Sequence, residues 1–148
     1  MMSFSACIVD ANVALQLVLK QELTDSASAL FDRVVADDPL QMHVPDLFFA
    51  EITNVLTLQT RLGKPRLLAE QAYAALQYLR LLPFAVTGNH ALGPRALELA
   101  ILHRLNGYDA IYVALAEKFD LPFITADNKL VNALKGYPGD IRWLGDVR

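Results

Sequence analysis

Residues 108–127 read YDAIYVALAEKFDLPFITAD and contain one complete unit of the predicted fold. Tyr108 to Phe119 carries apolar residues at the 3.6-residue spacing of a helix, and residues 122–125 form a short apolar run that is typical of a buried strand. An acid stands in the first turn of the helix, at Asp109, and another stands two residues after the strand, at Asp127. The stretch therefore predicts a helix that leads into a buried strand, with a carboxylate at each end.

The same alternation continues on both sides of this unit. Strands are predicted at Ala6 to Val9, Met42 to Val44, Phe84 to Val86, Phe123 to Thr125 and Ile141 to Leu144. Helices are predicted at Ala11 to Leu19, Leu23 to Val35, Asp46 to Leu62, Pro65 to Leu82, His90 to Leu105, Tyr108 to Phe119 and Asn128 to Leu134. Pro65 suits the first turn of its helix. Because no hairpin signal joins the strands, we expect an α/β fold, a three-layer α/β/α sandwich around a parallel sheet.

Length and composition favour one compact, non-membrane unit. The 148 residues, 54% of them hydrophobic, match a single domain spanning residues 1–148. The longest apolar stretch, Ala110 to Ala116, is far shorter than a membrane span. Met1 to Ala6 has no cationic region before an apolar run, so we expect no secretory signal and a cytoplasmic location. Cys7 has no second cysteine to pair with, and its apolar surroundings predict a buried, inert thiol.

The overall charge is acidic. A net charge of −3 and an isoelectric point near 5.5 argue against a protein that holds nucleic acid through a basic surface. Bound divalent cations would change this expectation, because they are often the largest local charges in a site.

Two acids lie just after predicted strands. Asp10 comes after Ala6 to Val9, and Asp127 comes after the strand that ends at Thr125; a helix is predicted to begin after each acid. Asp is a favoured helix N-cap, so capping alone could account for either residue. In open parallel sheets, however, ligands bind beyond the carboxyl ends of the strands. Both acids are therefore candidate functional residues.

Glu51 interrupts the apolar face of its predicted helix. On a helix from Asp46 to Leu62, Glu51 points along the same stripe as five apolar residues, namely Leu47, Phe48, Val55, Leu58 and Leu62. A carboxylate that faces a core is disfavoured unless it is paired, hydrogen-bonded or bound to metal. An internal ion pair with an arginine or lysine, for example Arg61 on the next turns, is the alternative to a metal.

Asp109 also faces inward in the predicted helix. Favourable interaction with the helix dipole is one sufficient reason for an acid in the first turn. Its neighbours on the helical face are nevertheless Tyr112, Val113 and Ala116. Basic residues are scarce near all four acids, whereas Mg²⁺ prefers oxygen ligands and is commonly held by a few carboxylates and phosphate oxygens. We therefore expect a metal-assisted phosphodiester hydrolase with one or two metal ions.

The order of these motifs resembles that of a known family. The relevant stretches are Ile8-Val9-Asp10-Ala11-Asn12-Val13, Val44-Pro45-Asp46 leading to Glu51-Ile52, Tyr108 to Glu117, and Thr125-Ala126-Asp127. Together they resemble the PIN domain, and specifically the VapC toxins of toxin–antitoxin modules. The resemblance spans nearly the whole chain.

The resemblance implies a function and partners. It implies a Mg²⁺ or Mn²⁺ site and endonucleolytic cleavage of RNA, with Asn12 and Thr125 supporting the metal or its waters. The implied ligands, which would also be the catalytic residues, are Asp10, Glu51, Asp109 and Asp127. It further implies a cognate antitoxin that occupies a groove on the toxin, and a homodimer.

Other classes of protein fit the pattern less well. A signalling receiver domain needs adjacent acids after the first strand, but Asp10 stands alone there. Phosphotransferases of the haloacid dehalogenase type need a second Asp at position 12, which is Asn12. A PIN-like module that binds RNA or protein without cleaving remains the alternative, because intact ligands do not prove turnover.

Overall fold

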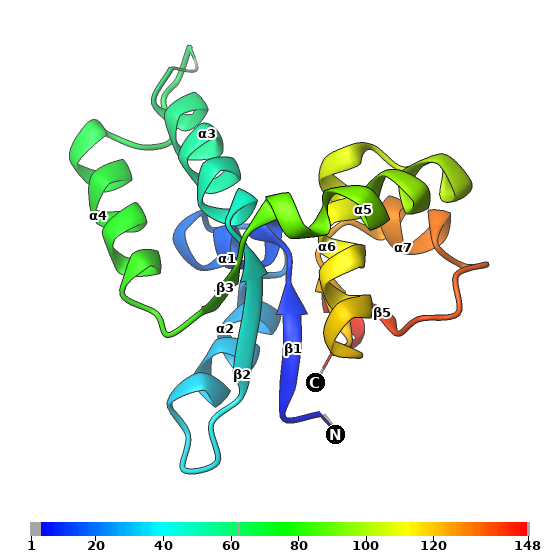
Figure 1. The fold of residues 1–148 in the computed structure, drawn as a ribbon. Helices are drawn as coiled ribbons and strands as arrows, with labels where there is room; N and C mark the ends of the chain where they lie inside the picture. The colour runs from blue at the N-terminus through cyan, green and yellow to red at the C-terminus, as the bar shows by residue number, and fades with distance from the viewer. Residues whose placement is uncertain (1–3, 62, 148) are drawn as a thin grey trace.

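Five parallel strands form the centre of the protein (Figure 1). The computed structural model describes residues 4–61 and 63–147. The strands are β1 (Ala6–Val9), β2 (Gln41–Pro45), β3 (Ala85–Thr87), β4 (Phe123–Thr125) and β5 (Ile141–Trp143). They lie in the order β3-β2-β1-β4-β5, and each neighbouring pair is parallel. The predicted α/β sandwich with a parallel sheet is confirmed.

Helices cover both faces of this sheet. They are α1 (Ala11–Val18), α2 (Thr24–Asp32), α3 (Leu47–Arg61), α4 (Ala69–Arg80), α5 (Asn89–His103), α6 (Gly107–Phe119) and α7 (Asn128–Ala133), with short 3-10 turns η1 (Arg33–Val35) and η2 (Leu144–Asp146). In Figure 1, α1 and α2 lie on one side of the strands and α5 and α6 on the other, while α3 and α4 stand beside each other as a pair. No helix within the described ranges has the length and apolar character to cross a membrane.

The core lies between the sheet and these helices. Cys7, Ile8 and Val9 of β1 are fully buried, and burial raises the pKa of the Cys7 thiol to about 12, as an inert cysteine requires. Helix α6 is apolar nearly all round, and six of its residues from Ala110 to Ala116 are buried. A helix of this kind needs cover on both sides. The sheet provides it on one side and α5 on the other.

Helix α4 begins later than its apolar spacing predicts. The prediction that Pro65 opens the helix is wrong, because the structure starts α4 at Ala69. The backbone N–H groups of Arg66 and Leu67 donate instead to the Gln59 carbonyl at 3.0 and 3.4 Å, which folds residues 65–68 back against the end of α3. The Leu68 N–H donates to Gln71 Oε1 at 2.8 Å, so a side chain near the helix start satisfies it.

Other predicted ends differ by a few residues. The helix predicted from Leu23 to Val35 is α2 followed by the turn η1, and the one predicted to reach Leu105 ends at His103, with Arg104 in the left-handed region at φ 55°. Leu62, the predicted end of the helix that contains Glu51, lies outside the described residues. These differences leave the carboxyl edge of the sheet unchanged.

Strand β1 lies at the point where the chain changes direction across the sheet. Its neighbours are β2 on one side and β4 on the other, although β4 comes much later in the sequence. Ligands in open parallel sheets bind in the crevice outside the carboxyl ends of the strands at such a point. Asp10 and Asp127 follow the two strands that border it.

Candidate metal and active site

Strands β1 and β4 position two of the predicted acids at one edge of the sheet. Val9 pairs in register with Ile124, and the Asp10 N–H donates to the Ile124 carbonyl at 3.0 Å. Asp127 follows two residues after the end of β4. Helices α3 and α6 contribute Glu51 and Asp109. We call these four residues the acid cluster.

Asp10 is the most deeply buried member of the acid cluster. Its residue is 5% exposed, and burial raises its pKa to about 7, with the negative charges of Glu51 and Asp109 adding to the rise. The Thr125 hydroxyl donates to Asp10 Oδ2 at 2.9 Å and opposes the rise. Asp10 stands at the N-cap position of α1, but its side chain accepts no capping hydrogen bond. Capping therefore does not account for this acid.

Thr125 and Asn12 connect the two strand ends. The fully buried Thr125 hydroxyl donates to Asp10 and accepts from the Asp127 N–H at 3.1 Å and from Asn12 Nδ2 at 3.3 Å. The Ala126 N–H donates to Asn12 Oδ1 at 2.9 Å. A hydroxyl has one donor and two acceptor sites, so these contacts use all three. The network fixes the carboxylate of Asp10 relative to the backbone of Asp127.

Glu51 bonds to a tyrosine rather than to an arginine. Tyr112 Oη donates to Glu51 Oε1 at 2.6 Å, and the structure pairs neither Glu51 nor Arg61 in an ion pair among the residues it describes. Burial raises the pKa of Glu51, the Tyr112 hydrogen bond lowers it, and Asp109 raises it. The alternative of an internal pair with Arg61 is thus wrong.

The helical face around Glu51 also differs from the predicted stripe. The buried residues of α3 are Phe48, Ile52 and Leu56, whereas Leu58 is 48% exposed. Glu51 lies half-buried at the margin of that face. It points inward, as predicted, because Tyr112 reaches it from α6.

Asp109 and Asp127 have different local roles. Asp109 is half-buried, and its pKa is raised by burial and by the charge of Asp127, while a hydrogen bond with Asn106 lowers it. Asp127 Oδ1 accepts from the backbone N–H groups of Lys129 and Leu130 at 3.0 and 3.3 Å, so it does cap α7. The capping interpretation holds for Asp127, and its second carboxylate oxygen has no hydrogen-bond partner in the described chain.

The donor set suits a hard divalent cation. The charges of Glu51 and Asp109 raise the pKa of Asp10, and the charge of Asp109 also raises the pKa of Glu51. No lysine or arginine in the described ranges forms an ion pair with any member of the acid cluster. Among these described residues, no three acidic, histidine or cysteine side chains are close enough to enclose an ion. Mg²⁺ keeps several waters and needs only one or two direct carboxylates, so a spaced set of oxygens fits it.

Tyr112 is the site residue that sequence reasoning missed. The sequence pattern indicated only that Tyr112 lies next to Asp109 on the same face of the helix. The available signal was a hydroxyl-bearing residue one turn after an acid, within the stretch Ala110 to Ala116 that is otherwise alanine and aliphatic. A buried tyrosine hydroxyl needs a hydrogen-bond partner, and Glu51 was the inward-facing residue without one.

Comparisons with known proteins agree with this architecture. Residues 7–135 match the family model of the PIN domain. Ribonuclease VapC1 of Mycobacterium tuberculosis is 30% identical over 138 residues, which are 92% of this chain and 96% of that protein. Among solved structures, PAE2754 from Pyrobaculum aerophilum has a TM-score of 0.69 at 24% identity, over 95% of this chain and 84% of that one.

A toxin–antitoxin complex from Klebsiella pneumoniae has a TM-score of 0.64 at 19% identity, over 92% of this chain and 95% of that one. At these identities the two structures support the fold alone, while the family match and the relative cover nearly the whole sequence. The chain therefore belongs to the PIN-domain family, among the VapC-type proteins.

Proposed function

We propose that this protein is a Mg²⁺- or Mn²⁺-dependent endoribonuclease that acts as the toxin of a toxin–antitoxin pair. The observation that carries the proposal is Asp10, a carboxylate 5% exposed beside two other acids, with no lysine or arginine paired to any of them in the described chain. Uncompensated buried charge is costly, and such groups are normally paired or bound to metal. The similarity to a protein named ribonuclease supports RNA as the substrate class.

Each residue of the acid cluster has a distinct task in this proposal. Asp10, Glu51, Asp109 and Asp127 would hold the cation through their oxygens, some of them directly and the others through the waters that the cation keeps. Thr125 orients Asp10 by donating to Oδ2, and Asn12 holds Thr125 in place. When bound, the cation supplies a water of lowered pKa and positive charge opposite the phosphoryl oxygens. It would also offset the acidity of the cluster, so that a phosphodiester can approach a protein of net charge −3.

A cleavage assay tests this function. RNA incubated with purified protein and Mg²⁺ should be cut internally, and EDTA, Asp10→Asn or Asp109→Asn should abolish cleavage while circular dichroism reports a folded protein. Sequencing RNA ends after brief induction would then identify the target. Cleavage that persists in EDTA or in both variants would refute the mechanism. A folded wild-type protein that binds RNA without cutting it would refute the enzymatic function.

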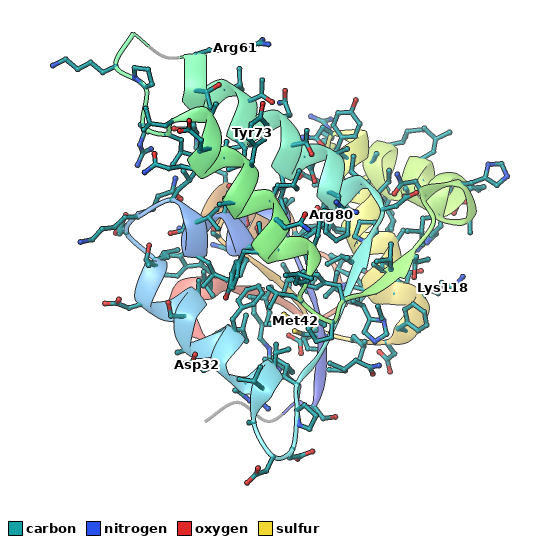
Figure 2. The ribbon with its side chains drawn as sticks, turned by 90° about the vertical axis from the view of Figure 1, so that its left-hand side faces the viewer. Asp32, Met42, Arg61, Tyr73, Arg80 and Lys118 are labelled. Carbon is teal, nitrogen blue, oxygen red and sulfur yellow. The ribbon has the colours of Figure 1, made fainter. Side chains whose placement is uncertain are left out.

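The proposed antitoxin would dock on α3 and α4. Two adjoining cavities of about 240 and 330 Å³ lie between these helices and share Thr53 and Leu76. Figure 2 shows Arg61 at the end of α3, with Tyr73 and Arg80 along α4. Tyr73 is 74% exposed, and in the part of the chain that the structure describes neither arginine has a carboxylate partner.

This chemistry fits an amphipathic antitoxin segment with acidic residues beside its apolar ones. Apolar side chains would enter the groove, and carboxylates would meet the two arginines. We expect a small protein encoded beside this gene to copurify and to relieve growth arrest. Arg61→Glu with Arg80→Glu should weaken copurification, and Lys118→Glu, a charge reversal on α6 away from this groove, should not. Equal retention by both variants would refute the docking surface.

A homodimer in a cytoplasmic location stays a prediction. Light scattering on the purified protein without antitoxin tests the oligomeric state, and fractionation of cells tests the location. A monomer at micromolar concentration would contradict the homodimer, and recovery with the membrane fraction would contradict the cytoplasmic location.

A further inference from the structure

Tyr112 is the one fully buried tyrosine among the five in the chain. It projects from α6, one turn after Asp109, and its hydroxyl reaches across to α3, where it donates to Glu51 Oε1 at 2.6 Å. The two residues are 61 positions apart in the sequence. A hydrogen bond this short to a carboxylate is charge-assisted, and such bonds fix geometry as well as contribute energy.

The ring of Tyr112 is held against the centre of the sheet. It stacks on Phe123 of β4, with ring centroids 5.6 Å apart and planes 12° from parallel. Phe123 is itself fully buried and pairs in register with Ile8, two residues before Asp10. The ring therefore packs on β4, the strand that leads to Asp127 and pairs with the strand that leads to Asp10.

Glu51 has no other anchor in the described chain. Tyr112 is its sole hydrogen-bond partner there, and no lysine or arginine forms an ion pair with it. Glu51 Oε1 is occupied by the tyrosine hydroxyl, and Oε2 accepts no hydrogen bond from these residues. A half-buried glutamate on a helix has three rotatable side-chain bonds, so without Tyr112 its carboxylate would sample several orientations.

We propose that Tyr112 is a positioning residue for the metal site: its hydroxyl holds the Glu51 carboxylate by Oε1 and leaves Oε2 free to ligate the cation. The inference rests on the proposed metal-dependent function. Hydrogen bonds to metal-ligating carboxylates commonly tune metal affinity about 10- to 100-fold. Tyr112 thereby links the position of α3 to that of the strands β1 and β4.

Tyr112→Phe removes the hydroxyl and keeps the ring that stacks on Phe123. We expect calorimetry to report Mn²⁺ and Mg²⁺ affinities about 10- to 100-fold weaker than in the wild type. In RNA cleavage, the cation concentration for half-maximal rate should rise by the same factor, and kcat at saturating cation should recover toward the wild-type value. A change in packing alone would lower kcat at every cation concentration.

Tyr137→Phe is the matched control. Tyr137 Oη donates to Glu117 Oε2 at 2.9 Å, so this variant removes a tyrosine–glutamate hydrogen bond outside the acid cluster. Its metal affinity should equal that of the wild type. In a Glu51→Gln background, Tyr112→Phe should cause no further loss of affinity, because the hydroxyl acts through Glu51.

The outcomes separate this inference from the function on which it rests. Three results would overturn only the role of Tyr112. They are a wild-type metal affinity in Tyr112→Phe, a loss of metal affinity in Tyr137→Phe as large as that in Tyr112→Phe, and an undiminished effect of Tyr112→Phe in the Glu51→Gln background. A folded wild-type protein that binds neither Mn²⁺ nor Mg²⁺ would overturn the metal-dependent function as well. If Tyr112→Phe does not fold, the metal affinity of Glu51→Gln tests the inference instead. An affinity of Glu51→Gln equal to that of the wild type would refute the inference, because Tyr112 is proposed to act through Glu51.

Discussion

Replacing Asp10 by asparagine should make the metal-free protein more stable while abolishing its proposed activity. Asp10 is 5% exposed, and its pKa is raised from 3.8 to about 7. Each pKa unit corresponds to about 1.4 kcal/mol, so ionising this side chain costs the folded protein about 4 kcal/mol. Asparagine has nearly the same shape, and its Oδ1 can accept the Thr125 hydroxyl as the carboxylate does. The substitution removes the charge and keeps the hydrogen bond.

The effect has a defined pH dependence. The unfolded chain releases the Asp10 proton near its ordinary pKa of 3.8, whereas the folded chain retains it up to about 7. As the pH rises between these values, ionisation therefore favours the unfolded state. The difference in stability between Asp10→Asn and the wild type should be below about 1 kcal/mol at pH 4 and should reach about 4 kcal/mol at pH 8.

Urea unfolding in EDTA measures this difference. With a slope of about 2 kcal/mol per molar urea, 4 kcal/mol moves the midpoint by about 2 M. Asp38→Asn, which neutralises an exposed acid outside the acid cluster, is the control and should move it little. Added Mg²⁺ should stabilise the wild type at pH 8 by mass action, and Asp10→Asn much less. The reasoning would be refuted if Asp10→Asn were no more stable than the wild type at pH 8. It would also be refuted if Asp10→Asn exceeded the wild type in stability by the same amount at pH 4 and at pH 8.

Three further predictions concern the ionisation of Asp10, the hydroxyl of Thr125 and the surface ion pairs of Arg95. The rate of RNA cleavage at limiting Mg²⁺ should rise with pH through the pKa of Asp10, about 7, because the ionised carboxylate binds the cation better. A cleavage rate that does not change with pH would contradict this, as would a midpoint pH that does not fall when the Mg²⁺ concentration is raised. Thr125→Val should lower the free energy of unfolding by about 2–4 kcal/mol in urea titrations and impair cleavage, because Asp10 loses its donor and the partly buried Asp127 N–H loses its acceptor. Thr125→Ser keeps the hydroxyl and should retain most of the stability and of the activity. Arg95→Ala should leave the melting temperature and cleavage nearly unchanged, because its contacts with Glu98 and Glu117 lie at the surface; a melting temperature many degrees lower would be inconsistent with such exposed ion pairs.

The parts of the fold set by local patterns could be predicted from sequence. Apolar runs such as Ala6 to Val9 identified the strands, and the acids that follow them were placed at the carboxyl edge because parallel strands end there together. The inward direction of Glu51 was also predicted, although the reason was incomplete: the buried face of α3 runs through Phe48, Ile52 and Leu56, and Glu51 stands at its margin.

Contacts between distant segments could not be predicted in this way. The start of α4 is decided by hydrogen bonds from Arg66 and Leu67 to Gln59, which no local propensity near Pro65 reveals. The partner of Glu51 is likewise fixed by how α6 packs across from α3, and an arginine on the same helix was the candidate visible in sequence. The periodicity of apolar residues predicts which face of a helix a residue lies on, whereas its hydrogen-bond partner depends on which element packs against that face.

Asp10 and Asp127 have the same sequence signature and different environments. Each follows a short strand and precedes a helix, yet Asp127 accepts capping hydrogen bonds from the backbone of α7, while Asp10 makes no capping hydrogen bond with α1. Thr125 connects the two residues, because its hydroxyl donates to Asp10 and accepts from the backbone of Asp127. Capping stabilises α7 through one oxygen of Asp127, whereas burial beside other acids destabilises the charged form of Asp10. Without a cation, the burial of Asp10 beside other acids adds no stability to the fold. Asp10 is therefore the acid whose position is best explained by function.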